Sequence, residues 1–375
     1  MNITVSPVTT PADKLAFIKS QWNFYRGDAN FVPPIIADRK KLLDTEKNPF
    51  YKHAEIQLFL AKRNGEAVGR IAAITNALHN EIHSDNIGFF GFFECENNPQ
   101  TATALFAAAE DWLRKHGKTH IRGPVNPSMN DECGLLIDGF NEPPMVLTTY
   151  NPRYYASLIS KAGFEKAKDL FAYILDNNDY INDKVRRIIN ALRERSQISI
   201  RSVNFKNKRQ FNLDVATLKE IYNAAWQPNW GFVKMTNEEF DFLAADLKQV
   251  ANPDYALILE ISGKPAGFAL AVPDINQTLI HNKNGSLLGA LWHLLTKRKH
   301  INQVRIIVLG MLPEYQRSGG DAALYFEIGE RGFKNGNQRG EASWILEDNV
   351  MMNRALQQTM KGTVYKTYRI YEKPL

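Results

Sequence analysis

The sequence predicts an α/β (α+β) protein made of two copies of one unit, each with a mixed, mostly antiparallel central sheet flanked by helices. Three observations predict it. The chain has 375 residues, which is long for one ordinary core and favours two domains. Short apolar runs bounded by turn residues alternate with helical patterns. Finally, several glycines of the first half recur at a nearly constant spacing in the second half.

The first half alternates helices and strands. Residues Lys14 to Arg26 predict a helix because Leu15, Ile18 and Trp22 fall on one face. The Asn64–Gly65 pair predicts a tight turn between two strands. We expect further strands at 56–62, 67–74, 87–93, 120–124 and 170–175, and further helices at 101–116 and 154–161.

The second half repeats this order. Two glycine pairs in the predicted hairpins lie 198 residues apart, and a third pair, each member ahead of a strand, lies 199 apart. These pairs are Gly65 and Gly263, Gly69 and Gly267, and Gly163 and Gly362. A shared spacing over about 100 residues indicates a tandem duplication. The predicted division is a first repeat at 1–176, a helical linker at 177–201 with an amphipathic helix at Asp183 to Arg195, and a second repeat at 202–375.

A glycine turn in the second repeat is the main candidate site. A strand at 304–311 leads into the turn Gln316 to Ala322, and a helix follows to about Phe333. A strand that ends in a glycine turn and opens a helix suits an anion, because free backbone N–H groups and the positive helix end face the ligand. Glycines allow close approach, and the side chains of Gln316 and Arg317 add donors.

This segment resembles the GNAT (N-acetyltransferase) superfamily, whose phosphate-gripping motif reads Gln/Arg-x-x-Gly-x-Gly/Ala after the fourth strand. Gln316 to Asp321 (Gln-Arg-Ser-Gly-Gly-Asp) fits with Asp321 in place of the last small residue, and Arg317 to Ala322 fits in full. In the first register the Asp321 carboxylate repels a diphosphate unless it points away. The resemblance covers about residues 200–372, and the whole chain resembles an uncharacterised group of bacterial tandem-GNAT proteins.

The resemblance implies acetyl-CoA or another acyl-CoA as substrate. In GNAT enzymes the fourth and fifth strands separate and the acyl-CoA arm pairs with the fourth like an added strand. Asn349, before the last helix, either contacts the coenzyme or only caps that helix. The expected coenzyme-binding residues are Leu309, Gly310, Met311, Gln316, Arg317, Ser318, Gly319, Gly320, Asp321, Ala322 and Asn349.

Catalytic groups are less clearly marked. The superfamily's usual general acid is a tyrosine on the last helix, and Met351 to Met360 contains none. Glu341 and Glu347, at the two ends of the predicted fifth strand, are the candidate bases for the incoming amine; the alternative is that both are solvated strand-end carboxylates. A backbone N–H near Met311 is expected to stabilise the oxyanion.

The first repeat lacks the glycine turn. After its strand comes Glu94 to Gln100, with two carboxylates and no glycine, and we expect their charge to disfavour a diphosphate. The first repeat is therefore predicted to be a degenerate copy that does not bind CoA. Its polar segment Arg122 to Gly134 either lines a substrate pocket or is a surface connection.

Two apolar features of the second repeat allow alternatives. Leu287 to Leu295 forms an acyl-chain pocket or lid, or else an amphipathic helix packed on the neighbouring repeat. Trp226 and Trp230 border an acceptor site or fill the core.

The leading hypothesis is an acyl-CoA-dependent N-acyltransferase, with acetyl as the expected group, in which a small-molecule or peptide amine attacks directly. Direct attack agrees with the lack of a recognisable nucleophile triad. The alternatives are a non-catalytic CoA-binding or sensor protein, and a Fem-like aminoacyl transferase, which also has two GNAT-type repeats.

Other partners are not expected. A net charge of +6 and short basic clusters, without a nucleic-acid-binding motif, give no sign of nucleic acid. The histidines show no metal-ligand spacing, and the two cysteines form no framework. No apolar stretch approaches the ~20 residues of a membrane span, so a cytoplasmic protein is expected; its oligomeric state and acceptor stay open.

Overall fold

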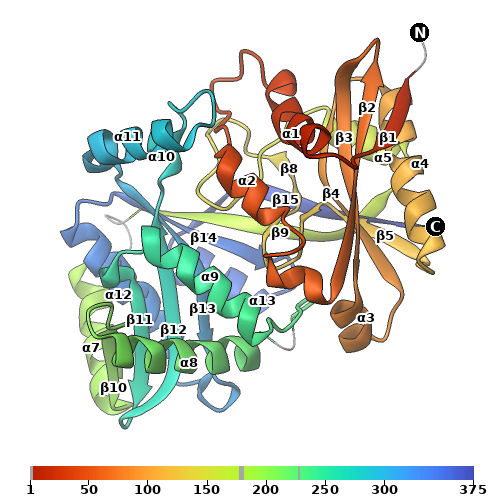
Figure 1. Ribbon diagram of the computed structural model, residues 1–375. Helices are drawn as coiled ribbons and strands as arrows, with labels where there is room; N and C mark the ends of the chain where they lie inside the picture. Colours follow the sequence, from red (N-terminus) through yellow and green to blue (C-terminus); the bar gives the residue numbers. More distant parts are fainter. Residues whose placement is uncertain (1–2, 177–180, 227–228) are drawn as a thin grey trace. The chain divides into compact units, whose positions relative to one another are not determined.

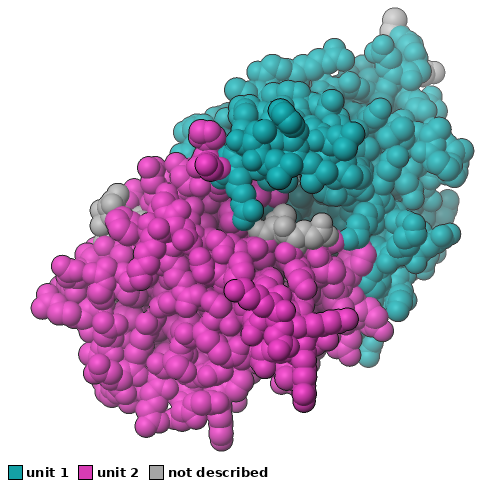
Figure 2. Space-filling model, turned by 60° about the vertical axis from the view of Figure 1, so that its left-hand side comes forward, with its two compact units in different colours: residues 1–170, 278–298, 366–375 teal, residues 171–277, 299–365 magenta. Residues whose placement is uncertain are grey.

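The computed structural model describes residues 3–176, 181–226 and 229–375 (Figure 1). The chain divides into two compact units, coloured separately in Figure 2. Unit 1 contains residues 1–170, 278–298 and 366–375, and unit 2 contains residues 171–277 and 299–365. The start of the predicted linker, residues 177–180, lies outside the described residues. The division of the sequence into 1–176, 177–201 and 202–375 therefore stays a proposal about repeats.

Unit 1 contains a sheet that is antiparallel except between its fourth and fifth strands. Its order is β1 (Thr4–Pro7), β2 (Ala54–Arg63), β3 (Glu66–Asn76), β4 (Ile87–Cys95), β5 (His120–Gly123) and the end of β15 (Thr363–Pro374), with β8 (Leu135–Asp138) also on β15. β6 (Val125–Asn126) and β7 (Glu132–Cys133) form a separate small hairpin.

Among its described residues, unit 1 has the three helices predicted in the first half, with shifted ends, and two that were not predicted, at Ile36–Leu42 and Ala77–His83. The helices of this unit are α1 (Pro11–Lys19), α2 (Ile36–Leu42), α3 (Ala77–His83), α4 (Pro99–Lys115), α5 (Tyr155–Lys161) and α11 (Leu287–Lys297), with 3-10 turns at Ser20–Phe24 and Pro49–Lys52. The predicted helix at 14–26 is thus an α-helix continued by a 3-10 turn. α4 buries Leu105, Phe106 and Leu113 in the same core as Phe90, so it covers one face of the sheet.

Unit 2 repeats the plan. Its sheet order is β14 (Arg339–Leu346), β13 (Gln303–Met311), β12 (Lys264–Pro273), β11 (Ala256–Ile261) and β10 (Ile198–Ser202), antiparallel except between β13 and β14. Its helices are α7 (Asp183–Arg195), α8 (Lys208–Ala225), α9 (Asn237–Val250), α12 (Gly320–Lys334) and α13 (Val350–Arg354), the last continued by a π-helical turn at Ala355–Thr359. A short helix, α10 (Asn276–Leu279), lies where the chain leaves unit 2.

The first hairpins of the two repeats have the same construction. Both turns, Asn64–Gly65 and Ser262–Gly263, place two residues in the left-handed region, with φ of 53° and 85° in one and 51° and 76° in the other. This is the geometry of a two-residue hairpin loop that matches the twist of its strands. Both hairpins also carry a register shift, after Ala61 and after Leu259. The predicted fold of two like repeats is confirmed.

The third glycine pair precedes β9 (Glu165–Asp176) and β15. Gly163 is left-handed, with a φ of 90°, whereas before β15 the left-handed residue is Lys361, one position ahead of Gly362. The turn therefore recurs with a shift of one residue. β9 and β15 are also two of the places where the chain passes from one unit to the other.

α11 has the helical form that was one of the two predictions for residues 287–295, and it belongs to unit 1. The apolar stretch at 287–295 forms a helix, but Leu288, Trp292 and Leu295 are exposed on it. The helix therefore lies with the first repeat, as one of the two predicted roles required, but its exposed leucines and Trp292 do not supply that contact, since Ala290 is the residue of the helix that is buried.

Candidate functional site

The β13–β14 pair opens partway along its length. The parallel ladder runs from Gln303 opposite Arg339 to Ile306 opposite Ala342 and continues no further among the described residues. β13 itself continues to Met311 on the β12 side, past a bulge at Ile307 that shifts its register. Bulges bend a strand and end pairing beside functional sites. One backbone edge of residues 307–311 thus lacks β14 as a partner, which is the separation that the resemblance implied.

The three predicted residues at the end of β13 pair with β12 through their other edge: Leu309 faces Ala269, Gly310 faces Phe268 and Met311 faces Gly267. Gly310 must be glycine, because a Cβ there would lie 2.3 Å from the Trp226 ring. Trp226 packs with Tyr222 and Phe268. Of its two predicted roles, Trp226 has the core-filling one.

The predicted glycine turn joins β13 to α12. A 3-10 turn at Pro313–Tyr315 comes first, and Gly319 is left-handed with a φ of 77°. α12 begins at Gly320, whose N–H donates to the Ser318 Oγ at 3.1 Å. The structure thus has the strand, glycine turn and helix start in the order that the sequence predicted.

Backbone donors remain available in this turn. The N–H groups of Arg317, Gly319 and Asp321 make no hydrogen bond within residues 3–176, 181–226 and 229–375. Gln316 and Arg317 are exposed. Asp321 lies in the first turn of α12, and its charge adds to the effect of burial in raising the pKa of Tyr325. Free amides at a positive helix end are suited to bind an anion.

α7 borders the turn on one side. A Cβ on Gly319 would lie 2.8 Å from a Leu192 methyl group of α7, so a side chain at 319 meets both a contact and an unfavourable φ. An ion pair between Arg193 and Glu327, at 2.7 Å, fastens α7 to α12. The helix predicted as part of the linker is therefore a wall of the candidate site.

Glu341, the first candidate base, lies in a buried polar cluster of Arg305, Glu341, Ser343 and Tyr365. Its side chain is 0% exposed and forms an ion pair with the Arg305 Nε at 3.2 Å. The Glu341 carboxylate also accepts hydrogen bonds from Ser343, at 2.5 Å, and from Tyr365. It is not the solvated strand-end carboxylate that was the alternative. Arg305 and Glu341 face each other one position before the β13–β14 ladder ends. The cluster therefore stabilises the two strands next to the point where they separate.

Glu347, the second candidate base, follows the end of β14 and is half-buried. Its backbone carbonyl accepts from the Asn353 amide at 3.3 Å. The Asn349 side chain accepts from the Met352 N–H at 3.2 Å, so Asn349 acts as a helix cap, one of its two predicted roles. Glu347 is the more accessible of the two candidate bases.

A tyrosine reaches the last helix from another strand. Tyr173 of β9 is fully buried, and its hydroxyl donates to the Asn353 Oδ1 at 2.8 Å and accepts from the Gln357 Nε2 at 3.0 Å. Burial raises the pKa of Tyr173. The last helix contains no tyrosine of its own, and Tyr173 lies 180 residues earlier in the chain than Asn353, so the sequence gives no local sign of this contact.

The corresponding region of the first repeat is filled by its own residues. The β4–β5 ladder ends at Phe89 opposite Arg122, so these strands also separate. The Phe92 N–H, however, donates to the Asn126 Oδ1 at 2.6 Å, and a Cβ on Gly91 would lie 1.7 Å from the Val125 carbonyl oxygen. The segment predicted to line a pocket or connect elements thus includes β6, which lies against β4.

The sequence predicted that the two carboxylates of the first repeat would repel a diphosphate. In the structure each carboxylate has an arginine partner instead. Glu96 binds Arg63 through two contacts, at 2.5 and 2.8 Å, and accepts from the Thr101 hydroxyl of α4. Glu94 lies 3.4 Å from Arg70. Their charge is therefore balanced, and the start of α4 is already capped by the Asn98 side chain, which accepts from the Gln100 N–H at 2.9 Å.

Glu94 is enclosed by hydroxyl groups as well. Tyr25 and Tyr155 donate to its Oε2 at 3.0 and 2.7 Å. Burial raises the pKa of Glu94 to about 7 although Arg70 opposes the shift. The site in the first repeat is a closed, internally satisfied cluster.

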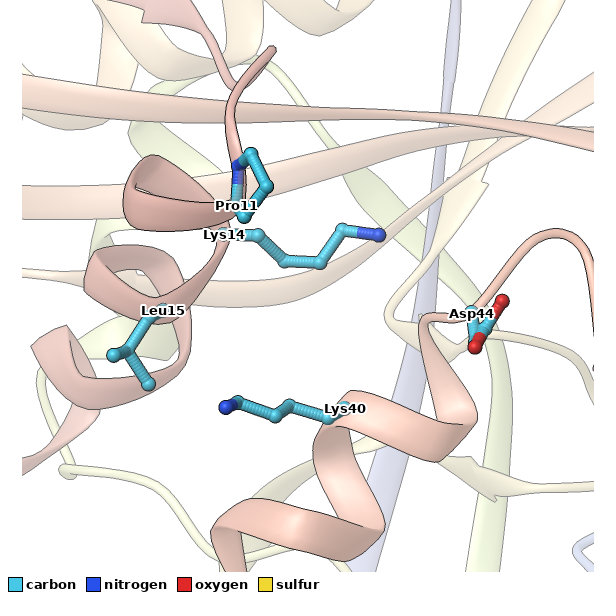
Figure 3. Close-up of a pocket in the computed structure, with 5 residues that line it drawn as sticks. All are labelled: Pro11, Lys14, Leu15, Lys40 and Asp44. Carbon is cyan, nitrogen blue, oxygen red and sulfur yellow. The ribbon is translucent and has the colours of Figure 1, made fainter.

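A surface hollow of about 230 Å³ lies elsewhere in unit 1, between α1 and α2 (Figure 3). Its lining residues are Pro11, Lys14, Leu15, Lys40 and Asp44. The Lys14 ammonium donates to the Leu43 carbonyl at 3.2 Å. The hollow contains none of the predicted site residues, and we assign it no role.

Within the part of the chain that the structure describes, no group of three or more His, Cys, Asp or Glu side chains is arranged to hold a metal. Both cysteines are buried and unbridged. No helix among the described residues is long and apolar enough to cross a bilayer.

Comparison with known proteins identifies relatives that match this chain along nearly all of its residues. The chain is 38% identical to the bacterial ceramide synthase of Caulobacter vibrioides over 383 residues, which cover 100% of this chain and 98% of the relative. It is 34% identical to protein YghO of Escherichia coli, covering 97% and 93%. No family model matches the chain.

Solved structures share the fold at low sequence identity. A tandem GNAT protein from the clavulanic acid biosynthesis pathway covers 100% of this chain and 98% of its own, with a TM-score of 0.60 at 11% identity. A GCN5-related N-acetyltransferase from Sphaerobacter thermophilus covers 99% and 95%, with a TM-score of 0.55 at 13% identity. The fold is therefore that of the GNAT N-acetyltransferases, as the turn motif predicted.

Proposed function

Since the chain belongs to the family that contains the Caulobacter ceramide synthase and YghO, we propose that it transfers a long-chain acyl group from acyl-CoA to the amine of a long-chain amino alcohol. The general class, an acyltransferase of GNAT fold, follows from the relatives and the fold together. The observation that carries the finer proposal is the 38% identity to a ceramide synthase along the whole chain.

The nature of the acyl group differs from the acetyl group expected from the superfamily alone. A ceramide is a long-chain amino alcohol with a fatty acyl group on its nitrogen, so the relative's name describes an amide-forming enzyme with two apolar substrates. The proposal keeps the N-acyltransferase chemistry and replaces acetyl by a fatty acyl group. The unidentified amine becomes a sphingoid-type base.

Acyl-CoA binding is assigned to the second repeat. In the proposal, the diphosphate is held by the free amides of Arg317, Gly319 and Asp321, with the Gln316 and Arg317 side chains beside it. The pantetheine arm pairs with the unpartnered edge of residues 307–311. Gly320 and Ala322 start the helix whose positive end adds to this attraction.

The reaction needs no enzyme nucleophile. The neutral amine nitrogen attacks the thioester carbonyl carbon, a C–N bond forms, and the C–S bond breaks. The amine proton passes to Glu347 directly or through water. The oxyanion is stabilised by a backbone N–H near Met311, and the leaving thiolate takes up a proton from water. Glu341 acts by positioning β14, because its oxygens are already engaged.

The test is a product assay on the purified full chain. We would supply sphinganine in detergent micelles with acetyl-, octanoyl- or palmitoyl-CoA, and follow amide formation by mass spectrometry and free CoA by thiol titration. Palmitoyl-CoA should be used at least about 10-fold faster than acetyl-CoA. Turnover of acetyl-CoA alone would restore the acetyl hypothesis, and CoA binding without amide formation would favour the non-catalytic sensor.

A Fem-like aminoacyl transferase is the remaining alternative. Such an enzyme would transfer an aminoacyl group from its tRNA and would not release a free thiol from acyl-CoA. The glycine turn in the second repeat, with its unengaged amides, favours the CoA thioester. Stoichiometric release of CoA thiol with amide product would exclude the alternative.

A further inference from the structure

α11 carries an exposed apolar face that the proposed chemistry does not use. The exposed fraction is 80% for Leu288, 65% for Trp292 and 82% for Leu295. Leu287 and Leu291 are also exposed on this helix. Consecutive members of this set are one or three residues apart along the helix. This spacing puts all five side chains on one helical face. Contiguous apolar surface of this kind marks a site of interaction.

The chain segment that carries this face is cationic. Residues 275–313 contain no aspartate or glutamate. Lys283 precedes α11, and Lys297 and Arg298 end it. Lys283 and Arg298 are exposed. An apolar face with a Trp and a cationic border fits an anionic lipid surface, where apolar side chains enter the acyl boundary and lysines meet the headgroups.

The segment that leads into α11 is hydrogen-bonded to other residues of unit 1. The Trp22 indole donates to the Lys283 carbonyl at 2.7 Å, and the Ile36 N–H donates to the Gly285 carbonyl at 2.9 Å. The helix starts at a cap, because the Ser286 Oγ accepts from the Gly289 N–H at 3.0 Å. In Figure 1 α11, drawn in cyan, follows α10 at the edge of the ribbon. Hydrogen bonds thus position the start of the helix that carries the exposed face.

We propose that the face of Leu287, Leu288, Leu291, Trp292 and Leu295 docks the protein on an anionic membrane surface. A helix of 11 residues lies in the interface and does not span the bilayer. Tryptophan is favoured at the membrane–water boundary. A second copy of the chain is the less suitable occupant, because two such faces would bring like charges together. This inference goes beyond the proposed function and does not rest on it.

The test is vesicle flotation of the full chain with neutral phosphatidylcholine vesicles and with vesicles containing 30% phosphatidylglycerol as a chosen condition. We expect binding to the anionic vesicles, weakened by salt. A double Leu288→Glu, Leu295→Glu variant should bind at least about 10-fold more weakly. A double Lys297→Glu, Arg298→Glu variant should lose about 10-fold on the anionic vesicles only.

The matched control is Leu213→Glu, a change of an equally apolar, 55% exposed residue on α8. It should bind vesicles like the unchanged protein, and circular dichroism should show all variants folded. Equal binding by the Leu288, Leu295 variant, or equal binding to neutral vesicles, would overturn the proposal. So would light scattering that shows a dimer which the same variant dissociates. Acyl transfer in micelles is assayed separately, so its failure would leave this test unaffected.

Discussion

The two repeats separate the same pair of strands and then use the gap differently. In the first repeat β6 lies against β4, the Glu96 carboxylate is bound by Arg63 and the Thr101 hydroxyl, and Asn98 caps the start of α4. In the second repeat the edge of β13 beyond Ile306 has no β14 partner, and the turn before α12 keeps unengaged amides. A gap that the chain fills itself supports the fold, and one that stays open is available to a ligand.

The comparison also shows that repulsion by two carboxylates, which the sequence predicted, is not what distinguishes the first repeat. Its carboxylates do not repel an anion, since each has an arginine partner. The helix start that follows them is capped from within the chain, because the Asn98 side chain accepts from the Gln100 N–H. A side-chain cap and an external phosphate both satisfy N–H groups at a helix start, so the residue type at the turn decides between a structural and a binding role.

The largest expected effect tests whether the first gap is filled. Gly91→Ala would place a Cβ 1.7 Å from the Val125 carbonyl oxygen, and we expect it to destabilise the protein by about 3 kcal/mol or more. Urea denaturation measures this. Gly340→Ala is the matched control in the second repeat, because its Cβ would meet only Val304 at 3.9 Å. Equal stability of the two variants would show that β6 does not close the gap.

The next effect tests the role of Glu341. Glu341→Gln leaves Arg305 buried without its counter-ion, which should cost about 3 kcal/mol of stability. A double variant with Arg305→Met should recover part of that loss. If Glu341→Gln removes acyl transfer and leaves the urea midpoint unchanged, Glu341 is the general base and our positioning role is wrong.

A pH-dependent effect tests the closed cluster of the first repeat. The pKa of Glu94 is raised to about 7 in the folded protein, so the folded state binds the proton more tightly than the unfolded one. Stability contributed by Glu94 is then present below pH 4.5 and falls as the pH rises to about 7, by about 2 kcal/mol between pH 5 and 8. The difference in unfolding free energy between Glu94→Gln and the unchanged protein measures it. A difference independent of pH would contradict it.

The smallest expected effect concerns the open site. Arg317→Ala removes an exposed charge beside the free amides, and CoA should bind about 10-fold more weakly, or about 1.4 kcal/mol. Isothermal titration measures this, with the exposed hairpin residue Lys264→Ala as control. Folding stability should not change in either variant. An unchanged CoA affinity for Arg317→Ala would mean that the turn is not the diphosphate site.

Much of the fold could be predicted because its signals are local. The helix at 183–195 has the predicted ends, and the Asn64–Gly65 turn has the predicted conformation. The turn at 316–322 was found from glycines followed by a helical pattern. These features depend on residues close in sequence, where periodicity and backbone preference act.

What could not be predicted depends on pairing between distant residues. Glu341 was placed at the end of a strand, but its burial follows from Arg305 on the parallel neighbour and from Tyr365. Tyr173 reaches Asn353 across 180 residues. The helices at 208–225 and 237–250 were not predicted from the sequence. A single sequence does not show which strands become neighbours.

The position of residues 366–375 in unit 1 affects how the chain folds while it is being synthesised. Residues 366–375 belong to unit 1, where Tyr371 pairs with Gly123 of β5 and the Leu375 N–H donates to the Thr119 carbonyl at 2.9 Å. During translation, β5 therefore has no neighbour on that side until β15 has been made. Unit 1 begins before unit 2 but is completed only after residues 171–277 and 299–365 of unit 2 have been made, and a nascent chain stalled before β15 would present an unpaired strand edge to chaperones.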